Sequence, residues 1–420
     1  MAASSVRMAQ ILCRSISGRL GGGGSSFLGR VGSALTREGS RRVPRPEQCI
    51  QVATLIPTYG GKFPYEEPFD YQNKTFGSWQ QVTDKGSDRF NENTKVIIVE
   101  GNIGVGKNEF AKELASHFDL KYFPSVPEEQ CYRVPHNGFD IRELDELLPA
   151  HLNHYDLQKF YKDPNPECGR IGTQQIKWYQ QKFFTYCEAI LHLMSTGQGV
   201  VITRSVFSDR AFVDAMRKCG YITGRFSRYY NELERSTQCE LPHPHITVYL
   251  DAPLSVLKQR IQQRNDAKEQ NSAVLSDKYI ESIDRAYRNL VLPELRETGE
   301  VIEIDWTEKA DKIEMDVIVE ELAQLSLKND DKDDPKFLDW EIEEDDVVSY
   351  RRRFSKKKGE YYPGTMAKLF MVDPPMDCPE IILSGEDYAV YDEVVNDHPG
   401  VRLEPGYAPE LGYNPWVKVW

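Results

Sequence analysis

Residues 96–107 read VIIVEGNIGVGK, and this stretch decides the fold. The β-branched run at 96–100 predicts a short buried strand, and apolar residues at helical spacing from Phe110 to Phe118 predict a helix after the loop. The loop between them has the spacing G-x-x-x-x-G-K, which is typical of a P-loop whose backbone amides and lysine hold phosphate groups. The candidate phosphate-binding residues are Gly101, Gly104, Gly106 and Lys107.

Four further apolar runs predict strands at 122–123, 200–203, 245–250 and 301–304, and a long aromatic-rich helix is expected over 171–196. Strands that alternate with helices favour a parallel, doubly wound sheet. We therefore expect an α/β fold: a P-loop domain with a five-stranded parallel sheet and helices on both faces, plus an extended N-terminal arm and a C-terminal tail.

A P-loop normally continues with Ser or Thr after the lysine, because that hydroxyl ligates Mg²⁺. Here the position is Asn108. An amide oxygen has a different reach and cannot donate in the same way, so we assign no metal ligand to this chain.

A second motif follows the predicted third strand and reads RSVFSDR, residues 204–210. Together with GNIGVGK it resembles the deoxyribonucleoside kinase family over roughly residues 94–325. The resemblance implies that Gln175 and Asp209 hold a nucleobase, with Lys182 where the family usually has an arginine, and that Arg204 lies near the substrate hydroxyl. It also implies that Arg260 and Arg264 are lid arginines that clamp phosphates.

Two further positions depart from the family pattern. The family has a metal-side Glu before the Arg-Ser pair, where this chain has Thr203, and a general-base Glu after the second strand, where it has Ser125. Glu128 and Glu129 lie close enough in sequence to be considered as replacements for the base. Loss of a general base alone lowers rate by about 10²–10⁴, so we predict no catalytic residues and an inactive kinase-like fold.

The chain is similar over almost its whole length to one branch of this family, the kinase-fold accessory subunits of mitochondrial complex I. The similarity rests on STGQGVV at 195–201, on the RSVFSD motif and on the tail residues Pro405-Gly406-Tyr407 and Gly412. It implies a non-catalytic subunit of NADH:ubiquinone oxidoreductase on the matrix side of the inner membrane. The implied partners are other complex I subunits, and no cofactor is required. Two alternatives stay open: a sensor that binds a nucleotide or adenine dinucleotide without turnover, and an active mitochondrial deoxynucleoside kinase.

Residues 1–46 contain eight arginines and one acidic residue, a net charge of +7, whereas the remainder carries −20. An Arg- and Ser-rich, acid-poor start predicts a mitochondrial presequence, with a disordered basic arm as the alternative. The acidic remainder argues against nucleic acid as a partner. No uncharged apolar run approaches the roughly 18 residues of a membrane span.

The expected organisation is a presequence at 1–46, an extended arm at 47–93, the kinase-like domain at 94–327 and an extension at 328–420. The extension has an acidic block, a basic block and few periodic elements. Its large aromatic residues suit anchoring, because interface hot spots are enriched in Trp and Tyr. They are Trp340, Tyr361, Tyr362, Phe370, Tyr407, Tyr413, Trp416 and Trp420. We expect arm and tail to fasten the domain into complex I, and removal of the chain after Lys328 to leave the domain folded.

Overall fold

The computed structural model describes residues 54–401 apart from 59–60, 64, 66, 73, 75, 135–136, 165–169, 271, 311, 329–333, 355–374, 376 and 379. The predicted presequence lies outside the described residues. So do all the tail aromatics named above except Trp340.

A five-stranded sheet in the order β2-β3-β1-β4-β5 forms the centre of the molecule, and every strand pair is parallel. The strands are β1 (Val96–Gly101), β2 (Lys121–Phe123), β3 (Val200–Thr203), β4 (Ile246–Asp251) and β5 (Glu300–Asp305). The sequence prediction of five parallel strands is confirmed, with bounds that differ by at most one residue.

Successive residues of β1 point to opposite faces of the sheet, as the pleat of a strand requires. Val96 and Ile98 belong to one hydrophobic cluster, and Ile97 and Val99 belong to another. All four side chains are fully buried. The central strand is therefore apolar on both faces because both faces are covered.

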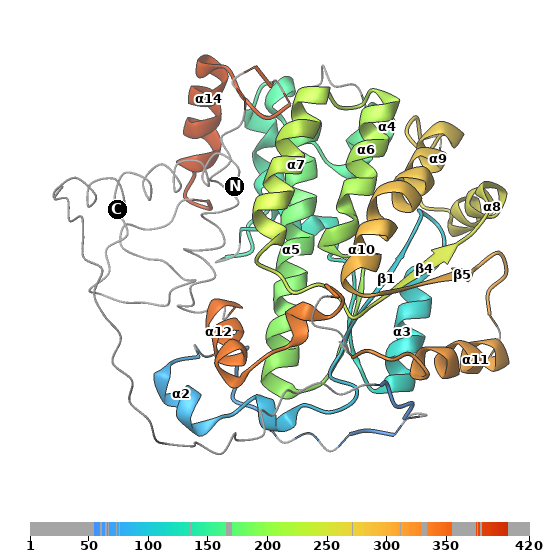
Figure 1. Ribbon diagram of the computed structural model, residues 1–420. Coiled ribbons are helices and arrows are strands. Elements are labelled where there is room, and N and C mark those ends of the chain that lie inside the picture. The colour runs from blue at the N-terminus through green and yellow to red at the C-terminus, as the bar shows by residue number, and fades with distance from the viewer. Residues whose placement is uncertain are drawn as a thin grey trace, which may run out of the picture.

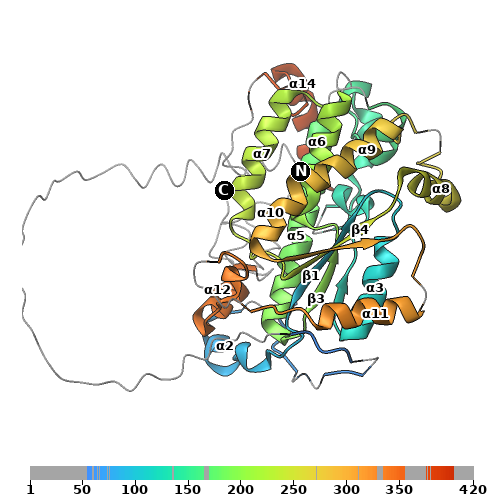
Figure 2. The same ribbon diagram turned by 45° about the vertical axis from the view of Figure 1, so that its right-hand side comes forward.

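Helices cover the two faces of the sheet unequally (Figures 1 and 2). Helices α3 and α11 pack on one face, where their apolar residues join the cluster of Ile97 and Val99, and α5, α6, α7, α9 and α10 supply the larger cluster on the other. The helix bounds are α2 (Ser78–Thr83), α3 (Lys107–Phe118), α4 (Leu157–Lys162), α5 (Ile171–Thr196), α6 (Asp209–Cys219), α7 (Gly224–Gln238), α8 (Leu254–Arg264), α9 (Asp277–Ala286), α10 (Leu292–Thr298), α11 (Lys312–Ala323), α12 (Glu344–Phe354) and α14 (Gly385–Tyr391). Among the described helices none is both long and apolar enough to cross a membrane.

The described parts of the arm and the tail meet each other on the α5 side of the domain (Figures 1 and 2). Arg351 of α12 is fully buried, and its Nη2 lies 2.5 Å from Oδ2 of Asp84, which follows α2. Its guanidinium also lies 4.0 Å from the centre of the Phe76 ring. We call Asp84, Arg89 and Arg351, together with Phe76, the arm–tail junction.

The tail also completes the core of the kinase-like domain. The Trp340 ring packs against His245 at a centroid distance of 4.0 Å with the planes tilted by 33°, and its Nε1 donates to the His243 carbonyl at 2.7 Å. Trp340, Val347 and Phe354 belong to the large hydrophobic cluster of the domain. A chain ending at Lys328 would lose this part of the core, so we expect truncation at that point to destabilise the domain.

A second tail segment packs on the far end of the domain, around α14. Glu380 is fully buried, and its Oε1 accepts from the backbone N–H of Thr223, the N-cap of α7, at 2.8 Å. The hydroxyl of Tyr391 lies 3.1 Å from Nε2 of His154. The described part of the tail thus contains two α-helices with buried contacts, more regular structure than the composition of the tail suggests.

Candidate functional site

The P-loop has the backbone that a phosphate-binding loop requires. Gly101 has φ +147° and Gly104 has φ +83°, in the region that favours glycine. A Cβ at Gly101 would lie 2.8 Å from the Leu250 carbonyl oxygen, and a Cβ at Gly104 would lie 2.8 Å from Ile261. Gly106 is the N-cap of α3, so the amide groups of the loop and of the first helical turn gather at one point.

The cations next to the loop are engaged by the protein itself. Lys107 Nζ donates to the Asn102 carbonyl at 3.0 Å, and Arg260 donates to the carbonyls of Val105 (3.0 Å) and Thr307 (3.2 Å). Burial, together with the nearby Arg204, holds the pKa of Lys107 well below its usual value. A phosphate group entering the loop has to compete with these carbonyls for the lysine.

The positions that carry base and metal chemistry in the kinases face each other as a pair of hydroxyls. The Ser125 N–H donates to Thr203 Oγ1 at 3.1 Å, and Ser125 Oγ donates to the Thr203 carbonyl at 3.2 Å. Both side chains therefore have partners within the fold. Neither is ionisable at neutral pH, so this pair can neither accept the substrate proton as a carboxylate would nor offer charge to a cation.

The residues present do not fit a Mg²⁺ ion. Oxygen ligands, carboxylates above all, are what Mg²⁺ takes from proteins. Asn108 is exposed at the start of α3, and Thr203 is paired with Ser125. Nowhere in the described chain do three or more His, Cys, Asp or Glu side chains gather as metal ligands would. We therefore derive no step through a metal.

A cavity of about 250 Å³ lies beside this hydroxyl pair. Three of the predicted site residues line it, namely Gln175, Arg204 and Asp209. Ser125, Thr203 and Lys182 line it as well. Small-molecule pockets usually measure about 300–1,000 Å³, so the cavity is tight for a nucleoside.

The polar end of the cavity is organised around Asp209. Gln175 Nε2 donates to its Oδ2 at 2.7 Å, the Tyr230 hydroxyl donates to the same oxygen, and the Lys182 ammonium pairs with the other oxygen. Asp209 and Gln175 are almost fully buried. The structure thus brings together the residues expected to hold a base, but it satisfies the carboxylate internally.

Arg204 reaches the cavity from a left-handed backbone, with φ +56°. Its guanidinium carbon lies 4.8 Å from the centre of the Phe212 ring. A non-glycine residue in this region marks strain that the surrounding fold must hold. The strained turn directly after β3 aims this cation at the cavity.

The two remaining candidates do not line the cavity. Arg264 Nη1 lies 3.1 Å from Glu269 Oε1, an acid whose side chain is only 7% exposed. Arg260 is held at the P-loop, as described above. The two predicted arginines lie one turn apart on α8 but bind different partners, one a loop carbonyl and the other a carboxylate.

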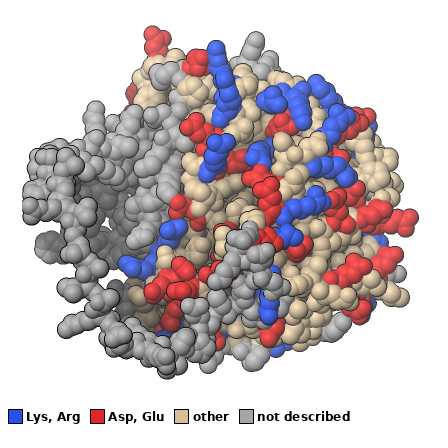
Figure 3. Space-filling view, in the orientation of Figure 1, with Lys and Arg blue, Asp and Glu red and all other residues tan. Residues whose placement is uncertain are grey.

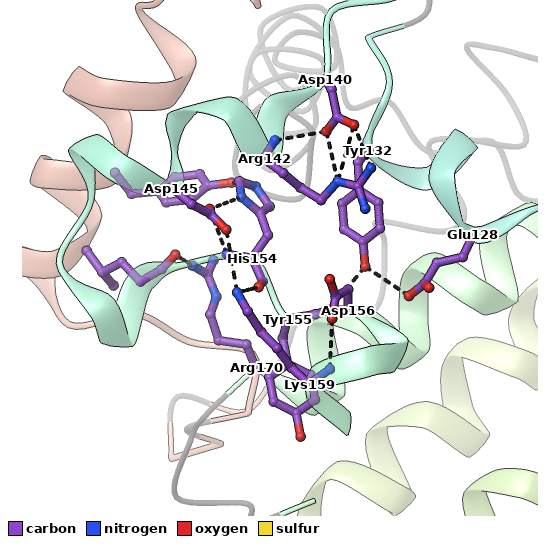
Figure 4. Close-up of polar contacts among 12 residues, drawn as sticks. Glu128, Tyr132, Asp140, Arg142, Asp145, His154, Tyr155, Asp156, Lys159 and Arg170 are labelled. Carbon is purple, nitrogen blue, oxygen red and sulfur yellow. Dashed lines mark hydrogen bonds and ion pairs between the residues drawn. The ribbon is translucent and has the colours of Figure 1, made fainter. Parts of the chain in front are cut away.

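Glu128, considered above as a replacement base, forms part of the cavity wall. Figure 4 shows the Tyr132 hydroxyl pointing toward it, and that hydroxyl donates to Glu128 Oε1 at 3.3 Å. The Leu157 N–H donates to the same oxygen, and Lys268 lies 3.7 Å from the other. Burial raises the pKa of Glu128 above its usual value. Its oxygens hold the chain around Tyr132 and Leu157.

Glu100 is a buried carboxylate that sequence reasoning assigned only to a strand. Its Oε1 accepts from the Ser205 N–H and Ser205 Oγ, each at 2.7 Å, and its Oε2 accepts from the Tyr287 hydroxyl at 3.0 Å. The sequence signal for this role was an acidic residue at the end of an otherwise apolar strand. Glu100 fixes the turn that carries Arg204.

The sequence profile described as "dNK: Deoxynucleoside kinase" matches residues 97–327, more than half of the chain. The chain therefore belongs to the deoxynucleoside kinase family, as its fold and loop geometry indicate.

Within that family the similarity is to proteins named "NADH dehydrogenase [ubiquinone] 1 alpha subcomplex subunit 10, mitochondrial". The mouse protein is 30% identical over 334 residues, which cover 80% of this chain and 86% of the relative. The cattle protein is 29% identical over 80% of this chain and 89% of the relative. A deoxyguanosine kinase of Dictyostelium discoideum is 28% identical over 54% of this chain and 68% of the relative. The similarity to the alpha subcomplex subunit 10 proteins thus extends well beyond the kinase region.

Proposed function

We propose that this protein is a non-catalytic accessory subunit of mitochondrial respiratory complex I, bound on the matrix side of the inner membrane, where it supports assembly or stability. The names of the relatives support the complex I role, because the similarity covers most of both chains. The observation that carries the non-catalytic part is the Ser125–Thr203 hydroxyl pair.

Phosphoryl transfer depends on positioning and on neutralisation of charge by a metal ion. The loop backbone and Lys107 can still position an anion. With Asn108, Ser125 and Thr203, the site offers neither a carboxylate for the metal nor one for the attacking hydroxyl. A site that can position an anion but lacks these groups supports binding of a phosphate compound. We expect its turnover to be negligible.

Binding of a nucleotide or an adenine dinucleotide without turnover is the second candidate. The Asp209 cluster favours it, because Gln175 and Asp209 retain the hydrogen-bonding groups that would hold a base. A ligand would have to displace Lys182 from Asp209 and widen the cavity. We therefore expect weak to moderate affinity.

A kinase assay tests the non-catalytic proposal. The mature protein, given deoxynucleosides, ATP and Mg²⁺, should show no phosphorylation above background. The triple variant Asn108→Ser, Ser125→Glu, Thr203→Glu should gain modest activity, whereas Asn108→Ser alone should not. Turnover by the unaltered protein at about 1 s⁻¹, the low end for kinases, would instead support the active-kinase alternative.

Native gels test the complex I role independently. Tagged full-length protein should co-migrate with complex I from mitochondria. In mitoplasts it should resist added protease until the inner membrane is opened by detergent. Migration away from complex I, or digestion in intact mitoplasts, would contradict the assignment.

A further inference from the structure

Helix α2 presents two large apolar side chains to solvent. Trp79 is 74% exposed and Val82 is 73% exposed, and they stand one turn apart on a helix of six residues. A helix this short is not stable by itself in water. The rest of the molecule must therefore hold this helix, with its exposed tryptophan, in place.

The arm–tail junction holds the C-terminal end of α2. Asp84 is its C-cap, and the Asp84 carboxylate is bound by both Arg351 and Arg89. Arg351 Nη1 also donates to the Asp84 backbone carbonyl at 2.8 Å. At the other end, the Gly77 N–H donates to Gln80 Oε1 at 3.0 Å. A buried ion pair contributes little net stability, but removal of either partner leaves an unpaired buried charge, which is costly. The pair therefore holds the end of α2 in place.

The start of α12 lies next to the end of α2 and is strongly acidic. Lys85 Nζ lies 3.6 Å from Glu344 Oε2, which joins the two elements at the surface. Figure 3 shows acidic side chains gathered at the lower left, in the region where Figure 1 places α12. The exposed acids are Glu341, Glu343, Glu344, Asp345 and Asp346.

Helix capping accounts for part of this charge. Acids in a first turn favour the helix dipole, and Asp346 accepts from the Glu343 N–H at 3.0 Å. Glu341 and Glu343 precede the helix, however, and two of the three arginines in the last turn of α12 are paired elsewhere. Arg351 binds Asp84, and Arg353 Nη1 lies 2.8 Å from Glu240 Oε2. The surface therefore keeps an excess of negative charge beside an apolar pair.

We propose that the exposed face of α2 and the acidic start of α12 together form a docking surface for a basic, amphipathic segment of another complex I subunit; this inference rests on the proposed function. The apolar side of that segment packs on Trp79 and Val82. Its Lys or Arg side chains meet the acids of α12. Tryptophan is favoured at interface hot spots, and complementary charge at the rim sets orientation and partner choice.

Replacement in cells that lack the endogenous protein tests this surface in the full-length chain. Trp79→Ala/Val82→Ala should keep the thermal midpoint of the purified protein, because both side chains are exposed. It should reduce incorporation into complex I about tenfold or more, as expected for a hot spot. Leu147→Ala removes a leucine of comparable exposure (65%) from another element and should leave incorporation unchanged.

The results separate this inference from the proposed function. Incorporation of the double variant at the level of the unaltered protein overturns the docking surface and leaves the proposed function standing. If the unaltered protein itself fails to co-migrate with complex I, both fall.

A photo-crosslinking residue at position 79 identifies the occupant. The expected product joins this chain to a Lys- or Arg-rich peptide of another subunit within the intact complex. A crosslink to residues 355–374 of the same chain, to a second copy or to an acidic peptide overturns the proposal, and so does the absence of any crosslink in assembled complex I.

Discussion

The carboxyl edge of the sheet and the arm–tail junction use charge in opposite ways. At the edge, the positions where a kinase needs carboxylates hold Ser125 and Thr203, two neutral residues whose side chains each hydrogen-bond to the other's backbone. At the junction, Asp84 and Arg351 form an ion pair whose side chains are 11% and 1% exposed. The two carboxylates that phosphate chemistry would use are replaced by neutral side chains, whereas an ion pair is buried where two extensions of the domain meet.

This difference indicates which contacts the fold depends on. A hydrogen-bonded hydroxyl pair tolerates substitution, because each partner is neutral and close to a cavity that water can enter. A buried guanidinium is costly to leave without its partner. We therefore expect substitutions at the junction to affect folding, and substitutions at the sheet edge to affect only what binds there.

The largest effect is expected from Arg351→Met, which leaves Asp84 without its deepest partner. Removal of one member of a buried ion pair costs about 3–5 kcal/mol, to be measured by urea unfolding. Arg353→Met, whose partner Glu240 is more exposed, should cost at most about 1 kcal/mol. Asp84→Asn combined with Arg351→Met should recover part of the loss. Equal, small effects for both arginines would remove the contrast between the two regions.

Acid should weaken the tail contacts next. Burial lowers the pKa of His154 to about 4, despite its hydrogen bond to Asp145. Because the unfolded chain binds this proton near pH 6.5, the stability is fully present above that pH and is lost as pH falls toward 4. The loss should reach about 3 kcal/mol.

Comparison of unfolding in the unaltered protein and in His154→Gln between pH 7 and pH 4 isolates this contribution. His192 and His245 are also buried with lowered pKa values, so both proteins should keep some acid sensitivity. A difference between the two proteins that does not change with pH would mean that His154 titrates normally.

Anion binding at the loop should respond more modestly. Lys107→Met removes the cation that reaches the phosphates, and a charged hydrogen bond contributes about 1.5–3 kcal/mol, or roughly 10–100-fold in affinity for ATP. Calorimetry with the full-length protein measures it. Lys112→Met, an exposed lysine on the same helix, is the matched control. Unchanged affinity in the Lys107 variant would show that ATP, if bound, lies elsewhere.

The smallest effect is expected from magnesium. Since Asn108 and Thr203 do not form a metal site, ATP affinity with Mg²⁺ and with EDTA should agree within about tenfold, or 1.4 kcal/mol. The same titration provides the test. A strong preference for Mg²⁺ would mean that a metal is bound through groups other than the family's. The sheet edge would then differ less from the arm–tail junction in its use of charge.

Local patterns predicted the sheet and the long helix α5 because their signals lie within one segment: β-branched runs, helical spacing and a glycine loop. The contact between Asp84 and Arg351 has no such signal, since it joins residues 267 positions apart. The three arginines at 351–353 suggest a solvated face, yet one of them is buried. Val347, Tyr350, Arg351 and Phe354 do have helical spacing, but the surrounding charges obscured it.

At the candidate site, too, local patterns could be read from the sequence and long-range contacts could not. The family motifs named Gln175, Arg204 and Asp209, and these three residues line one cavity because each motif follows a strand or lies on a long helix. They could not show that Tyr230 and Lys182 already satisfy Asp209, nor that Glu100 supports the turn of Arg204. Those contacts depend on how separate helices pack, which a single segment does not encode.

The separation of Asp84 from Arg351 also has a consequence in time. Until α12 docks, the face of α5 that it covers stays open, and closing a loop of 267 residues carries an entropic penalty of about 5 kcal/mol. The junction should thus be among the last parts of the fold to form. A chain that stalls before α12 would keep this apolar face available to chaperones and to aggregation.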